Sequence, residues 1–218
     1  MKKLLFDNLD GFLGKALAEA WERQGGCVID ASCRGGVSSA LSDISSPHGV
    51  VFTESVIDEA TLLSKAEDDP EQAVVFTESL HQQTIEFLAN CRAATQAMMP
   101  VKQGNVLALC VDDVAARVLG LPQSPIINQA RAAATKSLSK EYGRMGISYN
   151  TVVCQPSREM VEKSTWRASR DAMKVYSLRY SPVETSDYIS FLLSMFDGST
   201  IVNGGLICLG NGVMEMGA

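Results

Sequence analysis

A glycine-containing turn at residues 7–14, Asp-Asn-Leu-Asp-Gly-Phe-Leu-Gly, has the residue types of a phosphate-binding site. Glycines between a strand and a helix let the backbone approach a pyrophosphate, and the amides of the first helical turn then point at it. Gly11 and Gly14 occupy such positions, but the carboxylates of Asp7 and Asp10 beside them would repel an anion. We therefore favour the other interpretation of both glycines, which is close packing of a helix against a strand.

A second group of candidate residues follows the next strand-like run. Arg34, in Ser32-Cys-Arg34, is the residue type that binds a 2′-phosphate, whereas Asp30 is the type that binds the hydroxyl groups of a ribose. Both patterns are short, and neither excludes the other.

The elements that position these residues alternate between strand-like and helix-like segments along the whole chain. Such alternation with short connections predicts a parallel sheet with helices on both faces. We expect an α/β fold of the Rossmann-like, doubly wound type, with three layers and seven parallel strands, formed as a single domain by residues 1–218. The strands are expected at Lys3–Phe6, Cys27–Ile29, Val50–Phe52, Val74–Phe76, Asn105–Val111, Ser148–Val153 and Thr200–Leu209, and the main helices at Phe12–Arg23, Leu80–Met99, Asn128–Tyr142 and Pro182–Met195.

The hexapeptide Val-Val-Phe-Thr-Glu-Ser occurs twice, at residues 50–55 and 74–79. Each copy has a short β-branched and aromatic run followed by residues that favour the first turn of a helix. We interpret the copies as two equivalent strand-to-helix turns and not as a duplicated domain, because their flanking sequences differ.

Composition limits the classes of function. The net charge is −6, which argues against nucleic acid as a partner, and no apolar run reaches the ~18 residues that a membrane span needs. The six cysteines are widely spaced and have no metal-binding pattern, so we expect reduced thiols and a cytoplasmic protein.

The second half of the chain resembles the short-chain dehydrogenase/reductase family. The similarity extends, more weakly, over nearly the whole chain, and it implies the fold expected above. The segments that carry it are residues 120–122, 128–143, 147–153, 176–194 and 201–207.

The family's catalytic Tyr-x-x-x-Lys motif is missing, because no tyrosine in the chain is followed four residues later by lysine. With the alignment gap placed in the loop before the helix, the tyrosine position falls on Ser124 and the lysine position on Asn128. With the gap inside the helix, these positions fall on Ile127 and Arg131. We prefer the loop, because a gap within a helix rotates every later side chain by ~100° per residue.

Other functional positions of the family are also changed. The catalytic serine falls on Cys110 or Val111, the helical asparagine on Glu86, and the first glycine of the cofactor turn on Asn8. The family's Asn-Ala-Gly turn is missing after the expected fourth strand, and the helix that usually lies between this strand and the helix starting at Leu80 is deleted, which shortens the chain. Residues 154–157 replace the Pro-Gly that faces the nicotinamide.

These losses predict a catalytically degenerate subunit that pairs with an active NAD(P)-dependent dehydrogenase of the same family. We expect no catalytic, cofactor-binding or metal-binding residues and no bound cofactor. The resemblance implies assembly, as a homo- or hetero-oligomer, through the helices at 80–99 and 128–142. The benzylsuccinate-pathway hydroxyacyl-CoA dehydrogenase is a comparable case, since it joins an inactive and an active chain.

Two alternatives remain. The chain could be an NADP-dependent oxidoreductase with an altered site, in which Asp112, Asp113 or Glu86 acts as acid or base and Arg34 holds the cofactor. It could also resemble the cofactor-free halohydrin dehalogenases, which have arginine in place of the lysine, as at Arg131. That chemistry still requires the tyrosine, which Ile127 cannot replace.

Overall fold

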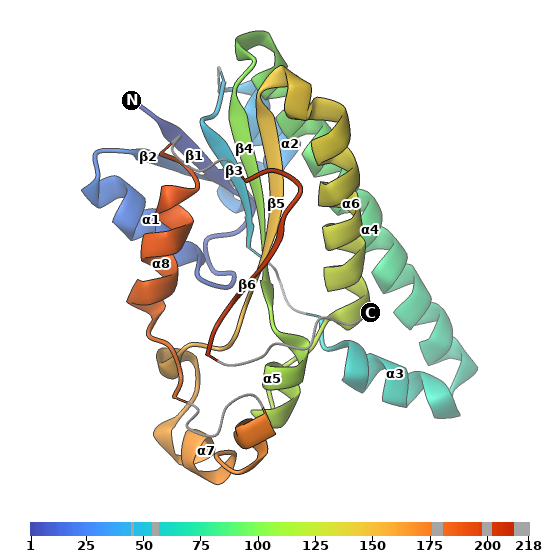
Figure 1. Cartoon of the computed structure of the whole chain (residues 1–218). Coiled ribbons are helices and arrows are strands. Elements are labelled where there is room, and N and C mark those ends of the chain that lie inside the picture. The colour runs from blue at the N-terminus through green and yellow to red at the C-terminus, as the bar shows by residue number, and fades with distance from the viewer. Residues whose placement is uncertain (45, 54–56, 176–180, 198–201, 212–218) are drawn as a thin grey trace.

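The computed structural model describes residues 1–218 except 45, 54–56, 176–180, 198–201 and 212–218. Its centre is a parallel sheet of six strands in the order β2-β1-β3-β4-β5-β6 (Figure 1). This confirms the single-domain, Rossmann-like α/β fold. The strands are β1 (Lys3–Phe6), β2 (Cys27–Asp30), β3 (Gly49–Thr53), β4 (Gly104–Val111), β5 (Ile147–Cys154) and β6 (Leu206–Leu209).

Helices cover both faces of the sheet (Figure 1). One layer holds α1 (Gly14–Arg23) and α8 (Thr185–Ser194), and the other holds α2 (Val37–Ser42), α4 (Pro70–Met98) and α6 (Pro125–Tyr142). The remaining elements are α3 (Glu59–Asp68), α5 (Asp113–Val118), α7 (Lys163–Ala168) and the short helices η1 (Ser32–Arg34), η2 (Met99–Val101), η3 (Gly143–Met145), η4 (Arg158–Met160) and η5 (Ala172–Val175).

The core forms on both sides of the sheet because successive strand residues point to opposite faces. In β1, Leu4 and Phe6 pack in the layer of α1 and α8, whereas Leu5 packs in the layer of α4. All five residues of β3 are buried, as expected for a central parallel strand.

The predicted strand at Val74–Phe76 is wrong, because these residues lie within the long helix α4. Asp69 caps this helix by accepting a hydrogen bond from the Glu71 amide at 2.9 Å, and Pro70 occupies its first turn. Both features begin a helix upstream of the valines, and they override the strand preference of the valines. The two hexapeptide copies are therefore not equivalent turns.

The place where the chain is shorter than the family pattern therefore differs from the prediction. In the classic doubly wound order a further strand lies outside β2, but within the described residues β2 pairs only with β1. Within the described residues, the element that is missing relative to this order is thus an edge strand, which would lie between β2 and β3 along the sequence and outside β2 in the sheet. It is not a helix before Leu80. The expected last strand is confirmed for Leu206–Leu209, while part of its predicted range lies outside the described residues.

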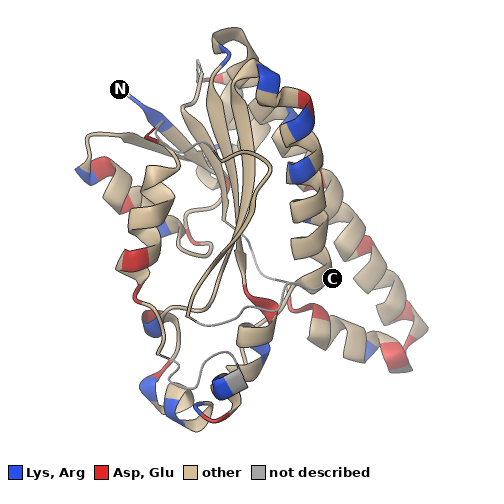
Figure 2. Ribbon diagram, in the orientation of Figure 1, with Lys and Arg blue, Asp and Glu red and all other residues tan. Residues whose placement is uncertain are grey.

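Charged residues are distributed unevenly over the molecule (Figure 2). The segment from η4 through η5, at the carboxyl end of the sheet, carries Arg158, Lys163, Arg167, Arg170 and Lys174. Two of these cations are paired, Arg158 with Glu184 at 2.9 Å and Lys174 with Asp171 at 2.6 Å. In the part of the chain that is described, no helix is long and apolar enough to cross a membrane.

Candidate functional site

The strand order reverses between β1 and β3, and the carboxyl ends of these strands form the position at which doubly wound folds bind ligands. Asp7 follows β1 directly and reaches across to the end of β3. Its carboxylate accepts hydrogen bonds from the Thr53 amide at 2.7 Å, the Thr53 hydroxyl at 3.0 Å and the Asn8 amide at 2.7 Å. Burial raises the pKa of Asp7 to about 6, although these hydrogen bonds oppose the shift.

Packing accounts for both glycines of the turn. A Cβ atom on Gly11 would lie 2.5 Å from the Thr53 carbonyl oxygen, and one on Gly14 would lie 2.6 Å from the Leu9 carbonyl oxygen. The Thr53 hydroxyl also donates to the Asn8 carbonyl oxygen. The turn is therefore fastened to β3, which requires glycine whether or not a ligand is bound.

The start of α1 differs from a typical anion site in two respects. Leu13 takes a left-handed conformation, with φ 58°, at the residue before the helix. Asp10 places a carboxylate beside the helix start, and Lys15 forms an ion pair with it at 2.5 Å. The lysine charge is thus already balanced by a neighbouring carboxylate.

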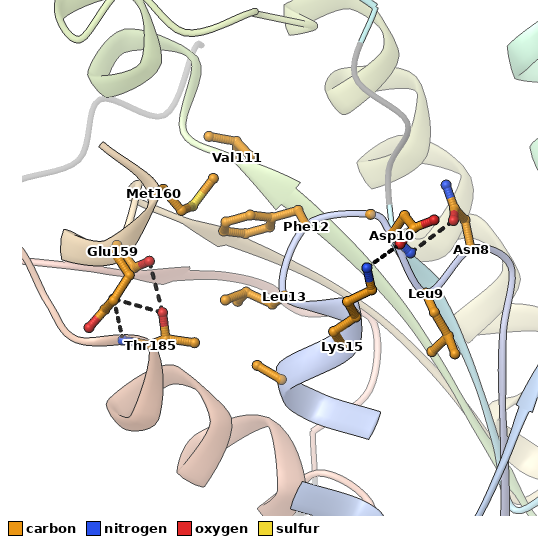
Figure 3. Close-up of a pocket in the computed structure, with 14 residues that line it drawn as sticks. Asn8, Leu9, Asp10, Phe12, Leu13, Lys15, Val111, Glu159, Met160 and Thr185 are labelled. Atoms are coloured by element: carbon orange, nitrogen blue, oxygen red, sulfur yellow. Dashed lines mark hydrogen bonds and ion pairs between the residues drawn. The ribbon is translucent and has the colours of Figure 1, made fainter. Parts of the chain in front are cut away.

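A cleft of about 880 Å³ opens beside this turn (Figure 3). Phe12 and Leu13 face Met160 and Val111 across it, so one side is apolar. Glu159 accepts hydrogen bonds from the Thr185 amide at 3.1 Å and hydroxyl at 2.8 Å. Burial acts to raise the pKa of Glu159, but these hydrogen bonds outweigh it and hold the pKa below its ordinary value. The cleft therefore contributes a second carboxylate, while its lysine, Lys15, is paired.

The family's tyrosine and lysine positions lie at the start of α6. Ser124, which is 2% exposed, donates its hydroxyl to the Ile57 carbonyl oxygen at 2.6 Å and its amide to Asp113 at 2.9 Å. Asn128 donates its side-chain amide to Asp113 at 3.0 Å and to the Val111 carbonyl oxygen at 3.2 Å. The groups that would face a substrate carbonyl are thus engaged in bonds within the protein.

Glu59, the first residue of α3, completes this network and was not among the residues expected from the sequence. The Glu59 carboxylate accepts hydrogen bonds from the amides of Ile126 at 2.8 Å and Ile127 at 2.9 Å, and so caps α6. Burial raises the pKa of Glu59, and the neighbouring Asp113 adds to this shift. The helical spacing of residues 58–68 could have predicted α3, but not its contact with α6.

The candidate acids are separated from one another. Asp112 caps α5 by accepting from the Ala115 amide at 2.7 Å, and Asp113 belongs to the network around Ser124, where burial raises its pKa. Glu86 is exposed on α4 and lines a different cavity, of about 230 Å³, together with Asp7 and Arg131. The structure therefore does not assemble these acids into one site.

The alternative alignment places its two residues within the helix layer. Ile127 is buried, and the Arg131 guanidinium lies 5.3 Å from the centre of the Phe87 ring. Cys110 is buried in β4, and of the two serine candidates only Val111 lines the cleft beside α1. Neither alignment provides a hydroxyl group above the cleft.

The candidates after β2 have local roles or face solvent. Asp30 accepts hydrogen bonds from the Ser32 amide at 3.0 Å and hydroxyl at 2.7 Å, and thereby supports the short helix η1. Arg34 ends that helix and is exposed. The 2′-phosphate interpretation of Arg34 is neither supported nor opposed by these contacts.

Helices α4 and α6, which pack against each other, carry exposed large apolar side chains. Large apolar residues on a monomer surface are common singly, but a group on one helix pair is typical of an interface. The group, which we call the outer face, comprises Val74, Val75, Ile85, Leu88 and Ile126, each between 44% and 56% exposed.

Comparison with known proteins identifies the fold. No family model and no curated protein matches the chain. Solved structures do match, among them a short-chain type dehydrogenase/reductase from Mycobacterium ulcerans, with TM-score 0.70, 13% identity and coverage of 95% of this chain and 87% of the other. A structure described as a "Dehalogenation enzyme" has TM-score 0.67, 16% identity and coverage of 96% and 97%. The fold is thus that of the short-chain dehydrogenases, whereas identity this low carries no information about activity.

Proposed function

We propose that this chain is a non-catalytic subunit with a short-chain dehydrogenase fold, which binds and supports an active dehydrogenase of the same fold. The observation that carries this proposal is the network at the start of α6. Ser124 donates to Ile57, and Asn128 donates to Asp113 and Val111, so the donors of both side chains are occupied within the protein. Serine and asparagine also lack the phenol and the ammonium group that would act on a substrate carbonyl. The loss of several members of a cooperative catalytic set should leave little activity.

The cofactor end supports the same proposal. A dinucleotide would place its pyrophosphate at the start of α1, next to Asp10 and near Glu159. Since the charges of Lys15 and Asp10 balance each other, Glu159 leaves the cleft with a net negative charge, which makes this position unfavourable for an anion. The residues present therefore do not fit NAD or NADP, and no step of a reaction is assigned to either.

The outer face of α4 and α6 is the surface proposed for the partner. The family assembles through these two helices, and the occupant we propose is the corresponding helix pair of an active dehydrogenase. Burying half-exposed Ile85 and Leu88 would remove apolar area from water, which stabilises a complex by about 25 cal/mol per Å² before the cost of association.

Co-expression with each short-chain dehydrogenase encoded in the same genome tests the proposal. We expect the two chains to co-purify in fixed stoichiometry, and Ile85→Asp to weaken the complex at least tenfold. Leu63→Asp on α3 is the matched control, since Leu63 is 48% exposed, as is Ile85, but lies off the outer face. Measurement of the complex mass distinguishes a mixed assembly from a homo-oligomer, and a chain that stays alone in the presence of every such dehydrogenase contradicts the proposal.

A second candidate, an NADP-dependent oxidoreductase with an altered site, is favoured by one observation. The raised pKa of Asp113 is the property of a general acid, and Asp113 contacts the lysine position at Asn128. This candidate requires cofactor binding with Arg34 on the 2′-phosphate. It therefore predicts that the isolated chain binds NADPH and that Arg34→Ala weakens this binding. The first proposal predicts that the isolated chain does not bind NADPH.

A further inference from the structure

The two copies of Val-Val-Phe-Thr-Glu-Ser have identical sequences, but residues 50–53 of the first copy differ in structure from residues 74–77 of the second. In the first copy Val50 and Val51 lie in β3 and are fully buried. In the second copy Val74 and Val75 lie in the first part of α4 and are 56% and 49% exposed. Exposed β-branched residues are unfavourable in a helix and favourable in a strand. The second copy is therefore a strand sequence held in a helix by its surroundings.

In the place of β3, the second copy would offer the same side chains as the first. Residues 74–77 repeat residues 50–53, so Thr77 would supply the same amide and hydroxyl to Asp7 that Thr53 supplies. The first difference lies one residue earlier, where Ala73 corresponds to Gly49. A Cβ atom at Gly49 would meet the Phe196 ring at 2.5 Å and the Leu4 side chain at 2.7 Å. Gly49 thus favours the first copy in the central position.

The sheet also has a place for the displaced first copy. Within the described residues, the outer edge of β2 is unpaired, and this is where the classic doubly wound order places a strand. The chain from β2 through α2 could reach this edge by a right-handed crossover. Residues 54–73 would then cross back to the centre of the sheet, and they exceed the ~10–12 residues that such a crossover needs.

We infer that the two copies exchange, so that the chain has a second arrangement in which residues 74–77 form the central strand and residues 50–53 form a seventh strand beside β2. In this arrangement α4 begins near Leu80, and Val74 and Val75 are buried. The exchange goes beyond the proposed function. In the second arrangement residues 57 and 59 belong to the connection from the edge of the sheet, so the contacts of Ile57 with Ser124 and of Glu59 with α6 are broken. The exchange also removes Val74 and Val75 from the outer face, which couples the arrangement of the sheet to the shape of that surface.

Thiol labelling of Val74→Cys, read by mass spectrometry of the peptide that contains it, tests the exchange. In the chain with Gly49 the new cysteine should react quickly. Gly49→Ala removes the preference for the first copy, and Ala73→Gly both removes the obstructing Cβ and weakens α4. We expect either change to slow labelling at position 74 at least tenfold for a substantial fraction of the molecules. Unfolding could only speed labelling, so protection reports burial in the sheet.

Two controls make the test specific. Ala89→Gly lowers helix propensity in α4 equally but lies outside the repeat, and it should leave the labelling at position 74 unchanged. Ile85→Cys, on the part of α4 that stays helical, should remain reactive in every background. The inference is overturned if labelling at position 74 is unchanged or faster in the Ala73→Gly chain. The Ala73→Gly chain also serves as the test if the Gly49→Ala chain does not fold.

Discussion

At the scale of single residues, Asp7 shows how the site departs from one built for a dinucleotide. It lies where the backbone of β1 ends, and its carboxylate holds Thr53 and the turn of Asn8 together. Burial nevertheless raises its pKa from 3.8 to about 6, so the charged form is destabilised in the folded protein. The Asp7 carboxylate, which links β1 to β3 by hydrogen bonds, therefore also lies beside the position that a dinucleotide would approach.

The titration of Asp7 predicts a pH dependence of stability. Because the folded pKa of about 6 lies above the ordinary 3.8, the unfolded chain loses its proton first as pH rises. The free energy of unfolding should therefore fall by roughly 2–3 kcal/mol between about pH 4 and pH 7 from this group alone. Asp7→Asn removes the titration, so its melting temperature should equal that of the parent near pH 4 and exceed it at pH 7. Parallel curves for the two chains across this range would rule out the account.

Restoring the family's catalytic residues should not restore catalysis. Ser124→Tyr combined with Asn128→Lys returns the motif to the sequence, but Ile57 and Glu59 still contact the start of α6. We expect no carbonyl-dependent oxidation of NADPH above the rate without protein, measured by absorbance on a variant that circular dichroism shows to be folded. Turnover by this double variant would show that the loss of two side chains, and not the surrounding network, is what prevents catalysis.

At the scale of elements, the strands and helices that alternate most regularly could be predicted. One strand was predicted wrongly because of neighbouring helix-start residues, and one contact between distant segments could not be predicted. Five of the seven expected strands, from Lys3–Phe6 to Ser148–Val153 and without Val74–Phe76, agree with the structure to within about two residues. Val74–Phe76 failed because the signals of Asp69 and Pro70 outweigh local strand preference. The contact of Glu59 with α6 joins residues 67 and 68 positions apart, and no periodicity reports such a contact.

The cap of α4 gives a prediction at this scale. Asp69→Ala removes the carboxylate that accepts from the Glu71 amide, and this should lower the free energy of unfolding by about 0.5–2 kcal/mol. The exposed Asp43, at the carboxyl end of α2, provides the comparison, since Asp43→Ala removes an acid that caps no helix start. Denaturant unfolding of both variants measures the difference. Equal effects would mean that Asp69 does not determine where α4 begins.

At the scale of the whole molecule, fold and site carry different information. The chain matches solved structures over at least 95% of its length at 13–16% identity, and two of these structures are described as short-chain dehydrogenases/reductases. The layers and strand order are thus maintained by burial patterns that many sequences satisfy. The fold could be predicted because burial repeats along each element, whereas the network around Ser124 depends on particular side chains from α3, α5 and α6.

A titration of the purified chain with NADPH, followed by nucleotide fluorescence, tests the absence of a working cofactor site most directly. Asp10 and Lys15 balance each other, and the carboxylate of Glu159 leaves the cleft negatively charged. We therefore predict no saturable binding up to ~1 mM, which corresponds to less than about 4 kcal/mol of binding free energy. A dissociation constant in the micromolar range would contradict the account and favour an oxidoreductase with an altered site.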